Sequence, residues 1–304
     1  MTSVPTPLPI TVTADDGTEL DGDLWLPAGA TAGAPVPGVV MSHGFSATRG
    51  MALPRFAEAF AAAGIAVCLY DHRSLGASGG EPRQAIDPWR QTLDMATVVG
   101  WLGARPEIDA DRLGAWGSSF SGGEVIALGA TDRRLKAVVA NAPFAGLGDL
   151  GPDDHDAAEV RFAAMSAVLT GARPLPEVTE IGPMAVVLEP GTEGSAFLPQ
   201  PESSEWFLAH GPGTGWQNHF TLSMSAEPPF DPFVCARHVA PAALLMVVAS
   251  HDVVASTEVA LAAYERATEP KQLEVVEGHH FVDYQGEGFD HVVGVMTDFL
   301  LAHL

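Results

Sequence analysis

The sequence predicts an α/β fold in which a mostly parallel central sheet is flanked by helices on both faces. Apolar runs of strand length alternate with segments of helical spacing over residues 1–143 and again over residues 241–304, a pattern typical of βαβ units. Residues 144–240 break this alternation, because they are rich in proline and glycine and hold 13 Asp and Glu against three Arg and no Lys. We therefore expect a core in two parts, residues 1–143 and 241–304, with residues 144–240 inserted as a lid or cap.

The first part of the core begins with an expected antiparallel hairpin over residues 10–27, which turns at Asp16 and Gly17. Short apolar runs predict the next strands, namely residues 37–42, 65–70, 112–117 and 136–140. Helical spacing predicts the helices between them, over residues 53–63, 88–102 and 124–130. Pro88 falls in the first turn of its helix, where proline is tolerated.

The remaining elements follow from the same patterns. Within the expected lid, residues 156–169 form one helix and residues 203–209 are a candidate for a second. The α/β pattern then resumes with strand, helix, strand and helix, over residues 242–250, 256–267, 272–276 and 288–304. We expect the lid to fold onto the core rather than alone.

Composition narrows the class of partner. The 304 residues are 47% hydrophobic, and the formal net charge is −23 with only two lysines. Such a surface repels phosphate backbones and anionic membranes, so we expect neither nucleic acid nor membrane as a partner. No apolar run reaches membrane-spanning length, and the first residues do not form a signal-peptide pattern. With only Cys68 and Cys235, no disulfide framework is expected, which fits a cytoplasmic protein.

The most informative stretch is LGAWGSSFSGG, residues 113–123, which joins a strand-like run to a helical pattern through small residues. This is the sequence form of a nucleophile elbow, in which Ser119 sits at the tip of a tight turn with its hydroxyl exposed. Small residues are needed two positions away on either side, because neighbouring backbone lies close there. Gly117 meets this need, and Ser121 stands where a second glycine is usual.

A serine alcohol is a weak nucleophile, so Ser119 needs an imidazole to take its proton and a carboxylate to orient that imidazole. Asp252 directly follows an apolar strand and comes after Ser119, in the order serine, acid, histidine. Asp71 also ends a strand but precedes the serine, so it is the poorer candidate. The base is His279 or His280, which lie beyond the last strand, and periodicity does not separate them.

The oxyanion of an acyl-transfer intermediate needs hydrogen-bond donors. The backbone N–H of Phe120, directly after the serine, is one candidate, and the N–H of Phe45, which follows His43 and Gly44, is the other. No Cys/His cluster has the spacing of a metal site, and no glycine-rich phosphate loop or dinucleotide fingerprint precedes a helix. We therefore expect no metal and no cofactor.

Segments spread over nearly the whole chain, the expected lid included, match one known family. They are SHGFSA (42–47), YDHR (70–73) with GASG (76–79), EPR (81–83) with DP (87–88), WGSSFSGG (116–123), EWF (205–207) and GHHF (278–281) with Tyr284. On these segments the chain resembles the α/β-hydrolase superfamily, and more closely its dienelactone-hydrolase-like, polyketide-transferase-type branch. In that branch the catalytic histidine directly precedes a phenylalanine, so the resemblance implies His280 as the base.

The resemblance implies ester, thioester or lactone chemistry, often in secondary metabolism. Some relatives carry cysteine at the elbow and transfer polyketide acyl chains, whereas Ser119 favours hydrolysis. The expected function is therefore that of a serine hydrolase acting through an acyl-enzyme on a small molecule with an apolar acyl part. The alternatives are acyl transfer, cyclisation or C–C bond hydrolysis by the same triad and, from another class, a non-catalytic binding module.

Aromatic residues of the expected lid are candidates to line the substrate pocket, namely Trp206, Phe207, Trp216 and Phe220. Each of them could equally belong to the ordinary core of the lid. A homodimer is compatible with the sequence, although no residue pattern requires one.

Overall fold

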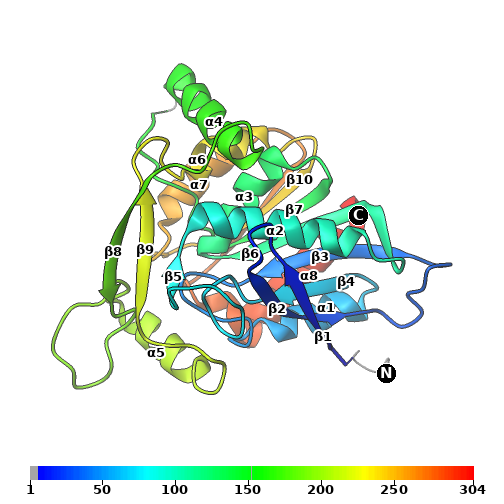
Figure 1. Ribbon diagram of the computed structural model, residues 1–304, viewed down its shortest axis with the longest axis horizontal. Helices are drawn as coiled ribbons and strands as arrows, with labels where there is room; N and C mark the ends of the chain where they lie inside the picture. Colours follow the sequence, from blue (N-terminus) through cyan, green and yellow to red (C-terminus); the bar gives the residue numbers. More distant parts are fainter. Residues whose placement is uncertain (1–5, 152) are drawn as a thin grey trace.

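An eight-stranded sheet forms the centre of the computed structural model, which describes residues 6–151 and 153–304 (Figure 1). In spatial order its strands are β1 (Leu8–Thr13), β2 (Glu19–Trp25), β4 (Ala66–Tyr70), β3 (Val36–Ser42), β6 (Ile108–Ser118), β7 (Leu135–Asn141), β10 (Ala243–Ala249) and β11 (Lys271–Val276). The six strands from β4 to β11 run parallel, and only the β1–β2 and β2–β4 pairs are antiparallel. The predicted mostly parallel central sheet is confirmed.

Helices cover both faces of the sheet, so its central strands are buried on both sides. One face packs against α1 (Pro54–Ala62) and α8 (Gly286–His303), and the other against α2 (Pro88–Gly103), α3 (Phe120–Thr131) and α7 (Thr257–Arg266). The start of α2 is fixed by Asp87, whose side chain accepts the N–H groups of Trp89 and Arg90. This arrangement places the carboxyl ends of the parallel strands at one edge of the sheet, where ligands bind in such folds.

Residues 144–240 contain the two helices expected there, as α4 (His155–Leu169) and α5 (Pro201–His210), followed by α6 (Pro232–Cys235) and a 3₁₀ turn, η1 (Ala236–His238). They also contain an antiparallel strand pair that the sequence did not predict, β8 (Val178–Met184) and β9 (Phe220–Ser225), with α5 between them in the chain. These two strands are visible at the left of Figure 1. Every residue of β8 except the last is exposed. A strand without a buried face does not need alternating apolar residues, and that alternation is the signal from which a strand is predicted.

The short strand β5 (Ala85–Ile86) pairs in parallel with β9 and completes a second sheet, in the order β5-β9-β8. Thus the strand pair β8–β9 is hydrogen-bonded to residues 85 and 86, which lie well before residue 144 and outside the expected lid boundaries. Two boundaries in the main sheet also differ from the expectation. β6 begins at Ile108 rather than 112, because Ile108 pairs with Val36, and α3 begins directly after the elbow serine.

The structure also bears on two expectations from composition, the absence of a membrane-spanning segment and the absence of disulfides. No helix in the described ranges 6–151 and 153–304 is long and apolar enough to span a membrane. Cys68 and Cys235 are both buried and unpaired in this part of the chain. Burial raises the pKa of the Cys68 thiol to about 12, so its thiolate is disfavoured at neutral pH.

Candidate active site

Ser119 occupies a sharp turn between β6 and α3. Its φ of 54° lies in the left-handed region, which typically costs a non-glycine residue about 1–3 kcal/mol and is maintained only by surrounding contacts. Its N–H donates to the carbonyl of Asn141 at 2.8 Å, and its own carbonyl accepts the N–H of Phe144 at 2.8 Å. A Cβ on Gly117 would lie 2.0 Å from the carbonyl oxygen of Ser121, so only glycine fits there. These are the features of a nucleophile elbow.

His280 and Asp252 form a hydrogen-bonded row with the serine. The Ser119 Oγ lies 2.9 Å from His280 Nε2, and His280 Nδ1 lies 2.5 Å from Asp252 Oδ2. Because a carboxylate can only accept, the imidazole proton belongs on Nδ1, which leaves Nε2 to accept the proton of the serine hydroxyl. We refer to these three residues as the triad row.

Asp252 is held as a carboxylate. Its Oδ1 accepts the N–H groups of Val254 and Ala255, each at 2.8 Å. Burial alone would raise the pKa of Asp252, but the hydrogen bond and charge of His280, with those two N–H groups, outweigh burial and lower it. The acid of the row is therefore ionised at neutral pH.

The other ionisable candidates lie elsewhere. His279 is exposed, and its Nδ1 accepts the N–H of Phe281 at 3.2 Å, so of the two adjacent histidines only His280 reaches the serine. Asp71 is bonded to the side chain and N–H of Arg49, 22 residues earlier. His251 is 69% exposed and lies beside Glu277. None of these side chains takes part in the triad row.

The loop after β3 passes directly beside the serine, since a Cβ on Gly44 would lie 2.9 Å from the Ser119 Cβ. Phe45, the next residue of this loop, and Phe120, the first residue of α3, both line the pocket that contains Ser119. Within the described ranges, neither of their backbone N–H groups donates to a protein oxygen. Both are thus free to bind an oxygen of a ligand.

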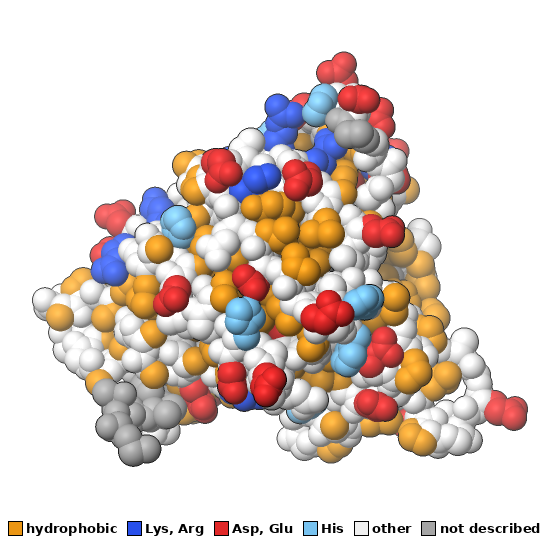
Figure 2. Space-filling view, turned by 180° about the vertical axis from the view of Figure 1, so that it is seen from behind, with side chains coloured by type: hydrophobic (Ala, Val, Ile, Leu, Met, Phe, Trp, Pro, Cys, Tyr) orange, Lys and Arg blue, Asp and Glu red, His pale blue; other side chains and the backbone are white. Residues whose placement is uncertain are grey.

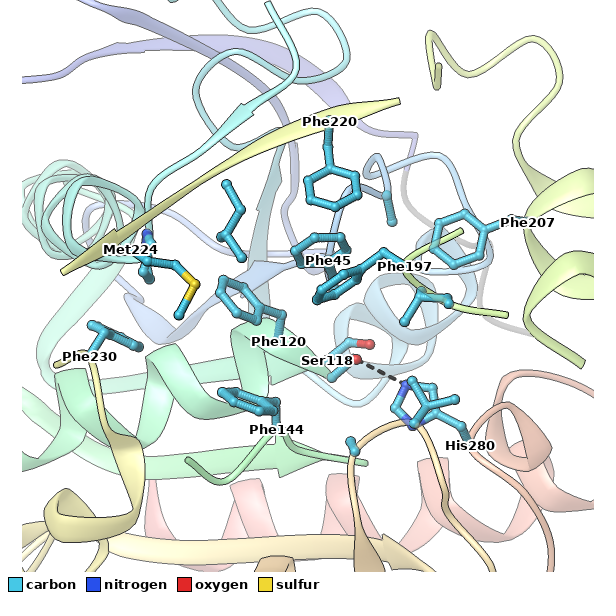
Figure 3. Close-up of a pocket in the computed structure, with 18 of the residues that line it drawn as sticks. Phe45, Ser118, Phe120, Phe144, Phe197, Phe207, Phe220, Met224, Phe230 and His280 are labelled. Carbon is cyan, nitrogen blue, oxygen red and sulfur yellow. Dashed lines mark hydrogen bonds between the residues drawn. The ribbon is translucent and has the colours of Figure 1, made fainter. Parts of the chain in front are cut away.

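An apolar pocket of about 400 Å³ opens at Ser119 and His280 (Figure 3). Its wall is mainly aromatic and aliphatic, and no Asp, Glu, Lys or Arg lines it. Met224 and Phe230 lie on the opposite side of the pocket from His280, as Figure 3 shows. The lining includes Phe45, Phe120, Phe144, Leu147, Ile181, Phe197, Leu198, Trp206, Phe207, Phe220, Leu222, Met224, Phe230 and Phe281.

Three of the four aromatic residues named from the sequence, Trp206, Phe207 and Phe220, line this pocket. Trp216 does not line it and packs instead against Phe207, with 5.6 Å between the ring centroids. Phe144, Phe197 and Phe230 also line the pocket; they could not be predicted because they belong to irregular segments without periodicity.

A buried polar cluster, also not predicted from the sequence, lies beside the triad row. The hydroxyls of Ser118 and Tyr284 are hydrogen-bonded to each other, and Asp283 is only 2% exposed. Burial raises the pKa of Asp283 to about 7, against the lowering effects of His280 and Asn141. The only sequence signal for this cluster is that Asp283 and Tyr284 closely follow the GHHF segment.

A family model for X-Pro dipeptidyl-peptidase (S15 family) matches residues 16–282, which is most of the chain. The chain belongs to the S15 family. The quorum-quenching protein AidA of Acinetobacter baumannii is 31% identical over 272 residues, which cover 87% of this chain and 86% of AidA.

Other relatives place this S15-family chain in the polyketide-transferase-type branch of α/β-hydrolases. Thiohydrolase aneE of Aspergillus aculeatus is 30% identical over 297 residues, covering 94% of this chain and 90% of aneE. The crystal structure of the α/β hydrolase GrgF from Penicillium superposes with a TM-score of 0.74 at 25% identity, covering 98% of this chain and 99% of GrgF. The chain is therefore an enzyme of the α/β-hydrolase type.

Proposed function

We propose that this S15-family enzyme is a serine hydrolase that cleaves an ester, lactone or thioester with an apolar acyl part. The observation that carries the proposal is the triad row, with contacts of 2.9 and 2.5 Å, at the mouth of an apolar pocket. A chain of this kind activates a serine hydroxyl, and an apolar pocket beside it binds the acyl group.

In the proposed reaction, Ser119 attacks the acyl carbon while His280 takes the hydroxyl proton and Asp252 stabilises the imidazolium. The N–H groups of Phe45 and Phe120 bind the oxyanion, a contact whose loss typically costs about 100- to 1,000-fold in rate. His280 then gives its proton to the leaving group, and the acyl-enzyme forms. Water, deprotonated by His280, attacks the acyl-enzyme, which releases the acid and restores Ser119.

The charge distribution supports an uncharged substrate. The pocket offers no Lys or Arg to a phosphate or carboxylate. The segments that form its wall carry acidic residues: Glu180 directly precedes Ile181 in the sequence, and Glu205 directly precedes Trp206. On the face shown in Figure 2, acidic side chains are scattered widely, whereas most Lys and Arg gather along one edge. We therefore expect an uncharged thioester to react faster than the coenzyme A thioester of the same acyl group, whose phosphates the acidic surface repels.

We further propose that residues 144–240 act as a lid. Ile181, Phe197, Trp206 and Phe220 come from this stretch and form the pocket wall that faces the core residues Phe45 and Phe120. A wall of this kind excludes water from the acyl group and selects its shape.

Acyl transfer is the second candidate, because relatives of similar length carry the names polyketide transferase and acyltransferase. The two functions share every step up to the acyl-enzyme and differ in the nucleophile that captures it. Product analysis with and without an added alcohol separates them. The free acid alone supports hydrolysis, and a new ester supports transfer.

The proposal is tested by labelling with a fluorophosphonate probe, followed by peptide mapping. We expect one adduct on Ser119 and none in Ser119→Ala, which should keep its fold and lose turnover of p-nitrophenyl esters. Ser166→Ala, on α4 and away from the pocket, is the matched control and should label normally. An active Ser119→Ala variant would exclude this mechanism.

A further inference from the structure

Four buried polar side chains form a network behind the elbow and outside the triad row. They are His43, His72, Ser121 and Glu124, and each is at most 2% exposed. His43 follows β3, His72 follows β4, and the other two residues lie on α3, so the network joins three separate segments. Buried polar groups of this kind are stable only when their hydrogen bonds are satisfied.

Ser121 is the centre of the network. Its Oγ lies 2.6 Å from the carbonyl oxygen of His43, 2.7 Å from Glu124 Oε2 and 2.7 Å from His72 Nε2. A carbonyl can only accept, and a hydroxyl has one proton, so the Ser121 proton is given to His43. The contacts from Glu124 and His72 must then be donated to Ser121.

This proton count requires a neutral carboxylic acid at Glu124 and a proton on Nε2 of His72. Burial agrees with both assignments, because it raises the pKa of Glu124 well above its usual range and lowers that of His72 well below. Within the described part of the chain, no Lys or Arg forms an ion pair with Glu124. The charge of an ionised Glu124 would therefore have no compensating cation.

The network ends on the loop that supplies the Phe45 N–H. His43 Nε2 accepts the N–H of His72 at 3.1 Å, so its Nδ1 carries the proton and donates to the Gly44 carbonyl at 3.0 Å. The N–H of Ala47 reaches the same carbonyl at 3.1 Å. In a trans peptide the C=O and the following N–H point in opposite directions. Holding the Gly44 oxygen therefore fixes the direction of the Phe45 N–H.

We propose that Ser121 and a protonated Glu124 are positioning residues that hold the His43–Phe45 loop in the geometry needed to bind the oxyanion. The inference rests on the proposed function, because it needs the Phe45 N–H to act as an oxyanion donor. It also accounts for the serine found where a second glycine is usual in an elbow, since glycine has no hydroxyl to hold His43.

Kinetics of three variants test the proposal on p-nitrophenyl esters. Ser121→Ala and Glu124→Ala break the chain of donors, and each should lower kcat about 10- to 100-fold with KM nearly unchanged, less than complete loss of an oxyanion donor. Glu124→Gln should stay within about threefold of the parent enzyme, because its amide N–H still donates to Ser121. Glu265→Gln, an exposed carboxyl on α7, is the matched control.

The outcomes separate the two proposals. If the parent enzyme is neither labelled by fluorophosphonate nor active, the proposed function fails. If it is labelled and active but Ser121→Ala keeps its kcat, the positioning role is wrong. Should an alanine variant fail to fold, Ser121→Gly and Glu124→Gln replace it, with loss of kcat expected only for Ser121→Gly.

Infrared spectroscopy tests the protonation state independently of activity. The difference spectrum between the parent protein and Glu124→Gln at neutral pH should contain the C=O stretch of a carboxylic acid. A carboxylate band in its place would overturn the proposed role of Glu124.

Discussion

Phe197 stacks on Phe45, with 4.7 Å between the ring centroids and 25° between the ring planes. Both residues line the pocket but come from distant segments, Phe45 from the loop beside Ser119 and Phe197 from the segment between β8 and α5. Phe197 is nevertheless 44% exposed, so its ring covers the pocket and also meets solvent. Phe197 thus packs, together with Phe220, on the ring of Phe45, the residue whose N–H is the proposed oxyanion donor.

Replacing Phe197 by alanine should lower kcat/KM for long apolar acyl esters about 2- to 10-fold, the value of one aromatic contact of 0.5–1.5 kcal/mol. Acetyl esters, which are too short to reach this ring, should be unaffected. Leu175→Ala, an exposed apolar residue that does not line the pocket, is the control. Equal loss for short and long esters would argue against a role in acyl selection.

Asp252→Asn should lower kcat by roughly 1,000- to 10,000-fold, because an amide in this position disturbs the imidazole tautomer that Ser119 needs. The rate of fluorophosphonate labelling should fall in parallel, and circular dichroism should be unchanged. Asp298→Asn, on the exposed side of α8, is the control. Activity within tenfold of the parent enzyme would show that Asp252 does not orient His280.

Asp283→Asn should change how stability depends on pH. The pKa of Asp283 is raised to about 7 in the folded protein, so the folded state holds a proton that the unfolded state releases near pH 4. Its contribution is fully present below about pH 4 and is lost as pH rises towards 7, by at most about 1.4 kcal/mol per pH unit. Relative to Asp283→Asn, the parent protein should therefore lose stability between pH 4 and 7.

Urea unfolding at pH 5, 6, 7 and 8 measures this difference. The gap between the parent protein and Asp283→Asn should change up to pH 7 and level off above it. Asp290→Asn, an exposed neighbour on α8, should show no such trend. A constant gap for Asp283→Asn would mean that this carboxyl is already ionised at pH 5.

Gly117→Ala should destabilise the protein by at least about 1–3 kcal/mol, because the added methyl group would lie 2.0 Å from a backbone oxygen of α3. Gly294→Ala, in the middle of α8 with no atom within 4 Å of the added carbon, should instead be neutral or stabilising by up to about 1 kcal/mol. Thermal unfolding of the two variants provides the comparison. Similar effects at both positions would contradict a tight elbow.

The parallel sheet could be predicted because its strands are buried on both faces and appear as continuous apolar runs. β8 could not, since its side chains are exposed and its pairing partner lies on a distant segment. The order of serine, acid and histidine, with strand ends, was enough to name Ser119, Asp252 and the pair His279 and His280. The structure brings Ser119, His280 and Asp252 within hydrogen-bond distance. Their catalytic roles stay predictions.

Local sequence did not predict which polar groups around the site are buried. The choice between His279 and His280 depended on a family resemblance, because adjacent residues share every local signal. Glu124 gave no signal and Asp283 only its place after the GHHF segment, since a carboxyl group is normally exposed and its burial depends on packing between distant segments. Residue type and spacing therefore found the groups in the triad row and missed those that support it.

The pairing of β5 with β9 limits how substrate can reach Ser119. Residues 85 and 86 belong to the segment leading into α2, and their backbone hydrogen bonds to β9 anchor the strand pair β8–β9 to the core. A rigid-body movement of β8 and β9 away from the core would break the β5–β9 hydrogen bonds. We therefore expect access to the pocket to depend on rotation of exposed lining side chains such as Phe197 and Met224, while β8 and β9 stay paired with β5.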